Sequence, residues 1–247
     1  MDEQSNEVEG KSVSTEEGGG FFQKWFDLYF NPQRSFQSID QKPDWVLPML
    51  TLAAISAVLM IFLMPILQQV QIERLMDIRG ISRGQAEEII QKAWKIQQVT
   101  TPVFVFVGVF VVQFVVAFFL YLVGTVFMGR PVSYIKVVSA WAYTSLAVGI
   151  VGMIVRAPIM FAKKTMTVQT SLAAFLSPDN KGSILYKIFD KLDVFVIWQL
   201  ILVTIGFMII YKFNSKKSAT IVFGLYILWI IVSVLLQSVI KTPRMGA

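Results

Sequence analysis

The feature that most constrains this chain is an uncharged stretch between Lys95 and Arg130. Its centre, residues 103–123, presents apolar side chains on every side of a helix, whereas a helix of a soluble domain needs a polar face. A helix that crosses the hydrocarbon core of a bilayer needs about 20 apolar residues. The stretch exceeds that length, so the medium around this helix is lipid, and the other helices have to be interpreted in the same terms.

Composition extends this conclusion to the whole chain. Apolar residues make up 55% of the 247 residues and charged residues 15%, which indicates several spans and not a single anchor. The absence of Cys removes disulfides and a thiol nucleophile. The absence of His removes the commonest general base and metal ligand at neutral pH. We therefore expect no cofactor and no metal.

The net charge of +6 is unevenly distributed. Residues 1–20 hold six acidic residues and Lys11, which leaves +11 on residues 21–247. Such an excess is found in proteins that bind nucleic acid, but in a multispan protein Lys and Arg flank the spans. The charges therefore favour a membrane protein with no nucleic-acid partner, and residues 1–20 are expected to form a disordered acidic tail.

Residues 21–44 have the pattern of an amphipathic segment at the membrane interface. Phe21, Phe22 and Trp25 recur at helical spacing, and Lys24 and Asp27 fall on the opposite side. This predicts a short helix with aromatic rings at the headgroups, packed against the protein's own spans or against a partner. The three aromatic residues are a candidate interaction surface.

A second short helix is expected directly after the first. Asn31 is a favourable N-cap, and Pro32 suits the first helical position. Phe36 and Ile39 are expected to face the membrane or the bundle.

The rest of the chain, residues 45–241, is predicted to be a membrane domain. The fold class is an all-α membrane protein, a five-span helical bundle with amphipathic interfacial helices. The expected spans are residues 45–67, 101–128, 137–158, 193–211 and 219–240.

Two long polar connections interrupt the spans. The second, residues 163–190, is predicted as a loop with a short surface helix at residues 170–178 and a turn at residues 178–182. The first, residues 68–100, is predicted as a loop that contains one amphipathic helix. Ser82 and Gln85 have capping-box spacing at its start. An apolar stripe follows, which packs on the membrane, on an extension of the first span or on a partner. The stripe consists of Ala86, Ile89, Ile90, Ala93 and Trp94, of which Ile89, Ile90 and Trp94 are candidate interaction residues.

Arg156 and Asp193 are a candidate pair within the membrane. They lie near the same ends of two antiparallel spans, and a guanidinium in lipid gains most from a carboxylate at the same depth. The alternative is that Arg156 snorkels to the lipid phosphates.

The short connections set the orientation. Arg130 and Lys136 flank one connection, and Lys212, Lys216 and Lys217 crowd the other, both on the side of the N-terminus. The positive-inside rule therefore places the N-terminus in the cytoplasm and the C-terminus outside.

The chain resembles the Yip-domain family over residues 25–240, and it looks most like the bacterial branch. The resemblance rests on these residues in this order: Asn31-Pro32-x-x-x-Phe36-x-x-Ile39, Pro43-x-Trp45-x-x-Pro48, Gly129-x-x-x-Ser133-Tyr134, Asp193-x-Phe195-x-Ile197-Trp198-x-Leu200 and Lys216-Lys217-x-Ala219.

The resemblance implies a five-span fold. Eukaryotic members bind small GTPases and carry Asp-Leu-Tyr-Gly-Pro. Here Phe30-Asn31 precede Pro32 in place of that glycine, so GTPase binding is not carried over. Some bacterial members work beside ABC-type exporters that remove toxic peptides. This implies lipid and other membrane proteins as partners, among them an exporter's permease and adaptor, in the cell membrane.

Three classes of function are weighed against each other. Catalysis is not expected, because no His is present and no Asp or Glu lies inside a predicted span. A small transporter or channel remains an alternative, although ion relays usually place charges at mid-membrane. A membrane-organising scaffold is a second alternative. The leading hypothesis is a non-catalytic accessory subunit that supports an ABC-type exporter through protein contacts.

The orientation gives the first testable prediction. A reporter enzyme that is active only outside the cytoplasm is expected to be active when fused after Ala247 and inactive when fused at Lys216. The measurement is reporter activity in whole cells, normalised to the amount of each fusion protein. Activity at Lys216 would invert the orientation.

Overall fold

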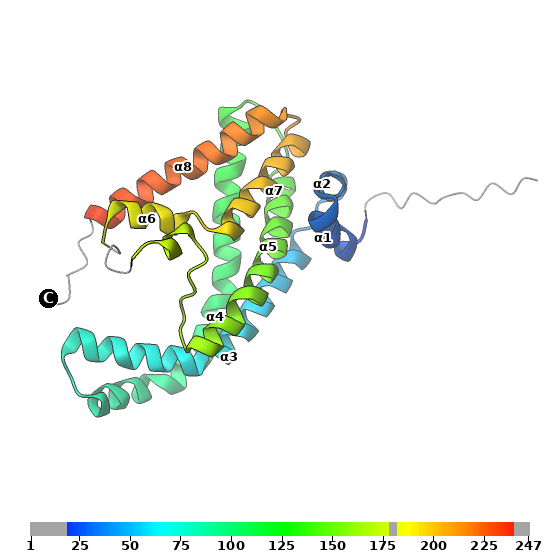
Figure 1. Ribbon diagram of the computed structural model, residues 1–247. Helices are drawn as coiled ribbons and strands as arrows, with labels where there is room; N and C mark the ends of the chain where they lie inside the picture. The colour runs from blue at the N-terminus through cyan, green and yellow to red at the C-terminus, as the bar shows by residue number, and fades with distance from the viewer. Residues whose placement is uncertain (1–18, 178–181, 240–247) are drawn as a thin grey trace, which may run out of the picture.

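The computed structural model describes residues 19–177 and 182–239. These residues are mostly helical and contain no strand, only an isolated bridge between Ser171 and Asp193. The predicted all-α membrane bundle is confirmed (Figure 1). In chain order the elements are α1 (Phe21–Phe30), α2 (Pro32–Gln41), α3 (Val46–Arg79), α4 (Arg83–Tyr121), the π-helix η1 (Leu122–Phe127), α5 (Tyr134–Lys163), the 3-10 helix η2 (Leu172–Phe175), α6 (Ile184–Lys191), α7 (Val194–Ile210) and α8 (Ser215–Val239).

An apolar helix occupies the place of each predicted span. Among the described residues, α3, α4 with η1, α5 and α8 are long and apolar enough to cross a membrane, with mean hydropathies between 1.9 and 2.9 over an apolar stretch of 18 residues in each. The remaining helix, α7, has 17 residues. At about 1.5 Å per residue it is about 25 Å long, which is at the lower limit for crossing the hydrocarbon core.

The loop predicted before the amphipathic helix in residues 68–100 is wrong, because α3 and α4 cover all of this segment except residues 80–82. The amphipathic helix itself is present as the start of α4. The first span continues as α3 to Arg79, and Gly80 then ends the helix at a φ of +60°, a backbone conformation that favours glycine. Ser82 and Gln85 form the predicted capping box at the start of α4. The polar composition therefore marks the part of the hairpin outside the hydrocarbon, where charged residues are compatible with helix.

The outer part of this hairpin packs against itself. Ala86 and Ile90 of α4 are buried against Ile72 of α3, with Trp94 half-buried beside them. The apolar stripe therefore packs on the extension of the first span, one of the three expected arrangements. Pro65 in α3 and Pro102 in α4 each remove a helical hydrogen bond and favour bending. Figure 1 shows the end of the hairpin turned away from the bundle.

The central helix of the bundle is α5, which contacts α1, α2, α3, α4 and α7. Small residues on it permit close packing. Ser145 accepts a hydrogen bond from Gln199 of α7 at 3.2 Å. A Cβ added at Gly149 would lie 3.0 Å from a methyl group of Leu52 of α3. Ser145 thus allows α7 to pack closely on α5, and Gly149 allows α3 to do so.

The second long connection contains structure that the sequence patterns did not predict. The 3-10 helix η2 falls within the short helix expected at residues 170–178, but α6 was not predicted. Helix α8 packs on α7 and α6. The tail predicted for residues 1–20 lies outside the described residues except for Gly19 and Gly20, and so does most of the turn predicted at residues 178–182.

Candidate functional site: two polar clusters and an aromatic face

A buried lysine attaches the α1–α2 pair to the bundle. Lys24 is 1% exposed, and its Nζ donates to the Lys42 carbonyl at 2.6 Å and to Asp44 Oδ1 at 2.8 Å. Tyr143 of α5 donates its hydroxyl to Asp44 Oδ2 at 2.9 Å. The predicted position of Lys24 on a polar outer face is therefore wrong. Spacing could not reveal this, because the partners lie 18 to 20 residues away along the chain.

Aromatic side chains of α1 pack along α5 and α7 beside this lysine. The Tyr29 hydroxyl donates to the Ala147 carbonyl of α5 at 2.9 Å and accepts from Trp25 Nε1 at 3.1 Å. Burial raises the pKa of the Tyr29 phenol, while the hydrogen bond from Trp25 acts in the opposite direction. The hydroxyl therefore stays protonated as a donor at neutral pH.

Helix α2 completes the attachment. The Asn31 side chain accepts from the backbone N–H of Arg34 at 3.3 Å, and Pro32 occupies the first turn, as predicted. Phe36 and Ile39 are fully buried in the bundle. Phe36 fits because Gly206 of α7 has no side chain: a Cβ there would lie 3.0 Å from the Phe36 ring. We call α1 and α2 together the docked hairpin.

The docked hairpin has a second aromatic face that points away from the bundle. Phe22, Phe26 and Phe30 recur every four residues on α1 and are 65%, 53% and 85% exposed. We call these three residues the outer phenylalanine face. The predicted interaction surface overlaps it only at Phe22, because Phe21 and Trp25 pack against the core. The i, i+4, i+8 spacing from Phe22 is the sequence signal that could have identified Phe26 and Phe30 as part of this face.

The three candidate interaction residues on the apolar stripe of α4 differ in their exposure. Ile90 is buried and Trp94 is half-buried, whereas Ile89 is 40% exposed. Most side chains of this stripe thus pack within the α3–α4 hairpin.

Arg156 and Asp193 lie together in the structure, at the N-terminal end of α7. Arg156 Nη2 lies 2.8 Å from Asp193 Oδ2, with the two side chains 33% and 13% exposed. The guanidinium also donates to the Thr170 hydroxyl at 2.9 and 3.2 Å, and that hydroxyl donates to Asp193 Oδ2. The Arg156 guanidinium lies 4.8 Å from the centre of the Phe195 ring.

The same carboxylate begins α7. Asp193 Oδ1 accepts from the backbone N–H of Phe195 at 2.8 Å, the N-cap role that an acid favours at a helix start. The backbone N–H of Leu172 donates to the Leu192 carbonyl at 3.0 Å. Arg156, Thr170 and Asp193 therefore join α5, the second long connection and α7 in one polar cluster, which we call the outer clasp.

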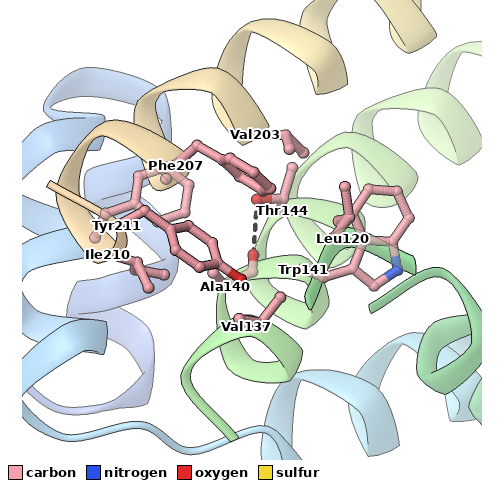
Figure 2. A pocket seen from close by; sticks show the side chains of 11 residues that line it. Leu120, Val137, Ala140, Trp141, Thr144, Val203, Phe207, Ile210 and Tyr211 are labelled. Atoms are coloured by element: carbon pink, nitrogen blue, oxygen red, sulfur yellow. Dashed lines mark hydrogen bonds between the residues drawn. The ribbon is translucent and has the colours of Figure 1, made fainter. Parts of the chain in front are cut away.

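Within the described residues, no group of three or more His, Cys, Asp or Glu is placed to hold a metal. A cavity of about 20 Å³ lies between α2, α4, α5 and α7 (Figure 2). It has room for about one water molecule. Its walls are almost wholly apolar, and the Thr144 hydroxyl on the wall is bonded to the Ala140 carbonyl at 2.8 Å.

The outer clasp yields a double-mutant prediction. Arg156→Ala and Asp193→Asn each lose the ion pair, while asparagine keeps the N-cap oxygen. We expect a coupling free energy of about 0.5 kcal/mol or more when both are combined, because neighbouring charged groups are not additive. The measurement is unfolding in mixed detergent micelles. Additive losses would show that Arg156 gains nothing from Asp193 and would contradict the pair.

Comparison with known proteins places these features in a family. The model of the Yip1 domain matches residues 26–237, which include α2 to α7, half of α1 and most of α8. Searches of curated proteins and of solved structures gave no match. Because the domain match covers most of the chain, the protein belongs to the Yip1 domain family.

Proposed function

We propose that this chain is a non-catalytic membrane subunit that acts by binding another membrane protein. The observation that supports this proposal best is the outer phenylalanine face. Its three rings are exposed, although α1 itself is held firmly on the bundle by Lys24 and Tyr29. Aromatic side chains that are both rigidly held and accessible are the groups that contribute most at protein interfaces.

The interior of the bundle also favours this proposal over the alternative that the chain transports a solute by itself. The cavity near Phe36 is too small for a solute, and the buried charge of Lys24 is used in an ion pair. Gln199, a polar residue of α7, bonds to Ser145 of α5. In lipid such bonds hold helices together.

The finer proposal follows the resemblance to bacterial Yip-domain proteins. We assign the chain to the cell membrane of a bacterium, with its N-terminus in the cytoplasm. Its partners would be the permease and adaptor of an ABC-type exporter of toxic peptides or amphiphiles. A GTPase partner is not proposed, because Phe30 and Asn31 replace the glycine that precedes the proline in GTPase-binding members. The Asp27 carboxylate lies 3.6 Å from Arg34 within the docked hairpin.

The test is to change the outer phenylalanine face without disturbing the docked hairpin. Phe22→Ser with Phe26→Ser is expected to lower copurification of the exporter subunits from native membranes at least tenfold, because two exposed aromatic anchors are lost. Phe175→Ser is the matched control. Phe175 is 87% exposed, and it lies in η2, beside the outer clasp. Unchanged copurification, with equal amounts of protein in the membrane, would contradict the proposal.

A second measurement separates a subunit from a transporter. The purified chain, reconstituted alone in vesicles, is expected to move no ion and no amphiphile. Transport by the chain alone would favour the transporter alternative instead.

A further inference from the structure

Cations from two short turns converge at one end of the bundle. One turn joins η1 to α5 and carries Arg130, and the other joins α7 to α8 and carries Lys212. Lys216 and Lys217 follow in the first turn of α8. The two turns are about 80 residues apart in the sequence, so their proximity is a property of the fold.

A buried phenylalanine brings the two turns together. The Arg130 guanidinium lies 6.0 Å from the centre of the Phe213 ring, and Lys217 Nζ lies 4.2 Å from it. Phe213 is buried, and its ring is stacked on Tyr211 at 5.7 Å. A cation over an aromatic ring keeps its charge and its N–H donors available to a further ligand. Both cations therefore lie within 6.0 Å of the centre of one ring.

The neighbouring carboxylate is already occupied. Asp40 of α2 binds Lys136 at 2.7 Å and also lies 3.5 Å from Lys212 Nζ. Within the part of the chain that the structure describes, no carboxylate forms an ion pair with Arg130, Lys216 or Lys217. The cluster of Arg130, Lys136, Lys212, Lys216 and Lys217 thus keeps a charge of about +4 after Asp40 is counted.

The surface beside the cluster is apolar. Val126 and Phe127, directly before the turn of Arg130, are 61% and 73% exposed, and Ile135 after it is also exposed. These side chains belong to helices that are long and apolar enough to cross a membrane. An anion that is bound at Arg130 and Lys217 is therefore adjacent to a surface suited to acyl chains.

We propose that Arg130 and Lys217 bind the phosphate of an anionic phospholipid, with its acyl chains against Phe127. Arginine is suited to bidentate binding of phosphate, and basic clusters between membrane helices recognise anionic headgroups. The exposed apolar surface favours a lipid over free phosphate as the source of the phosphate group. This site is independent of the proposed exporter partner, because it faces lipid and does not involve the outer phenylalanine face.

The test uses the full chain in a neutral detergent and compares three additives. Phosphatidylglycerol is expected to raise the melting temperature and to remain bound in native mass spectra. Phosphatidylcholine with the same acyl chains and inorganic phosphate at the same concentration are expected to do neither. An equal effect of inorganic phosphate would show a free-anion site and overturn the proposal. An equal effect of phosphatidylcholine would show a general lipid effect and would also overturn it.

Variants identify the residues. Arg130→Gln with Lys217→Gln is expected to weaken binding of phosphatidylglycerol about tenfold or more, because each basic residue near an anionic headgroup contributes several-fold. Arg83→Gln with Lys92→Gln is the matched control. It removes one Arg and one Lys from exposed i, i+4 pairs on the α3–α4 hairpin and is expected to leave binding unchanged.

Further variants cover the remaining outcomes. If the double variant does not fold, Lys217→Gln alone is measured, and several-fold weaker binding is expected. The exchange Arg130→Lys with Lys217→Arg, which keeps both charges, is expected to retain binding. Equal losses in the cluster variant and in the control would show that only total charge matters and would contradict a site at Phe213.

Discussion

The ion pair between Lys24 and Asp44 determines how the docked hairpin is held. A lysine that is 1% exposed has lost its water, and the loss is offset only because Asp44 and the Lys42 carbonyl receive its donors. Removing one partner of a buried pair costs about 3–5 kcal/mol. Asp44 is 32% exposed, so water screens the pair and the cost here is expected at or below the lower end of that range. Tyr143 extends the same contact into α5, the helix on which the bundle is built.

Charge in this protein is kept out of the apolar centre of the long helices, and the buried Lys24 is paired with Asp44. Asp44 precedes α3 and Asp193 precedes α7, so both carboxylates lie where backbone N–H groups begin a helix. Arg156 lies within α5, and the outer clasp provides its carboxylate. The middle of the bundle relies instead on small residues and a hydrogen bond between Gln199 and Ser145. The hydrocarbon core of a bilayer has no hydrogen-bonding groups, which accounts for this difference between the charged contacts and those in the middle of the bundle.

The sequence was sufficient to predict the long apolar helices and insufficient to predict which polar residues the bundle buries. Apolar runs longer than a bilayer core predicted α3, α4, α5 and α8, and capping residues such as Asn31 and Ser82 predicted helix starts. The extension of the first span to Arg79 was missed because charged residues were interpreted as loop. Burial of Lys24 was missed because amphipathic spacing assigns a lysine to the polar face. The proximity of Arg156 and Asp193 was predicted, since antiparallel spans bring residues of equal depth together, but the part played by Thr170 depends on a fold of the loop that has no periodic signal.

The most direct test of this account is hydrogen exchange of residues 21–41 in the full chain in lipid nanodiscs. In the unmodified protein these amides are expected to exchange as slowly as those of the bundle, because α1 and α2 are held on it. In Lys24→Ala, exchange in this segment is expected to accelerate at least tenfold, while α5 stays protected. Gln23→Ala, at the exposed neighbouring position, is the control and is expected to change little. Fast exchange of residues 21–41 in the unmodified protein, or no acceleration in Lys24→Ala, would contradict the account that a buried lysine holds the outer phenylalanine face in place.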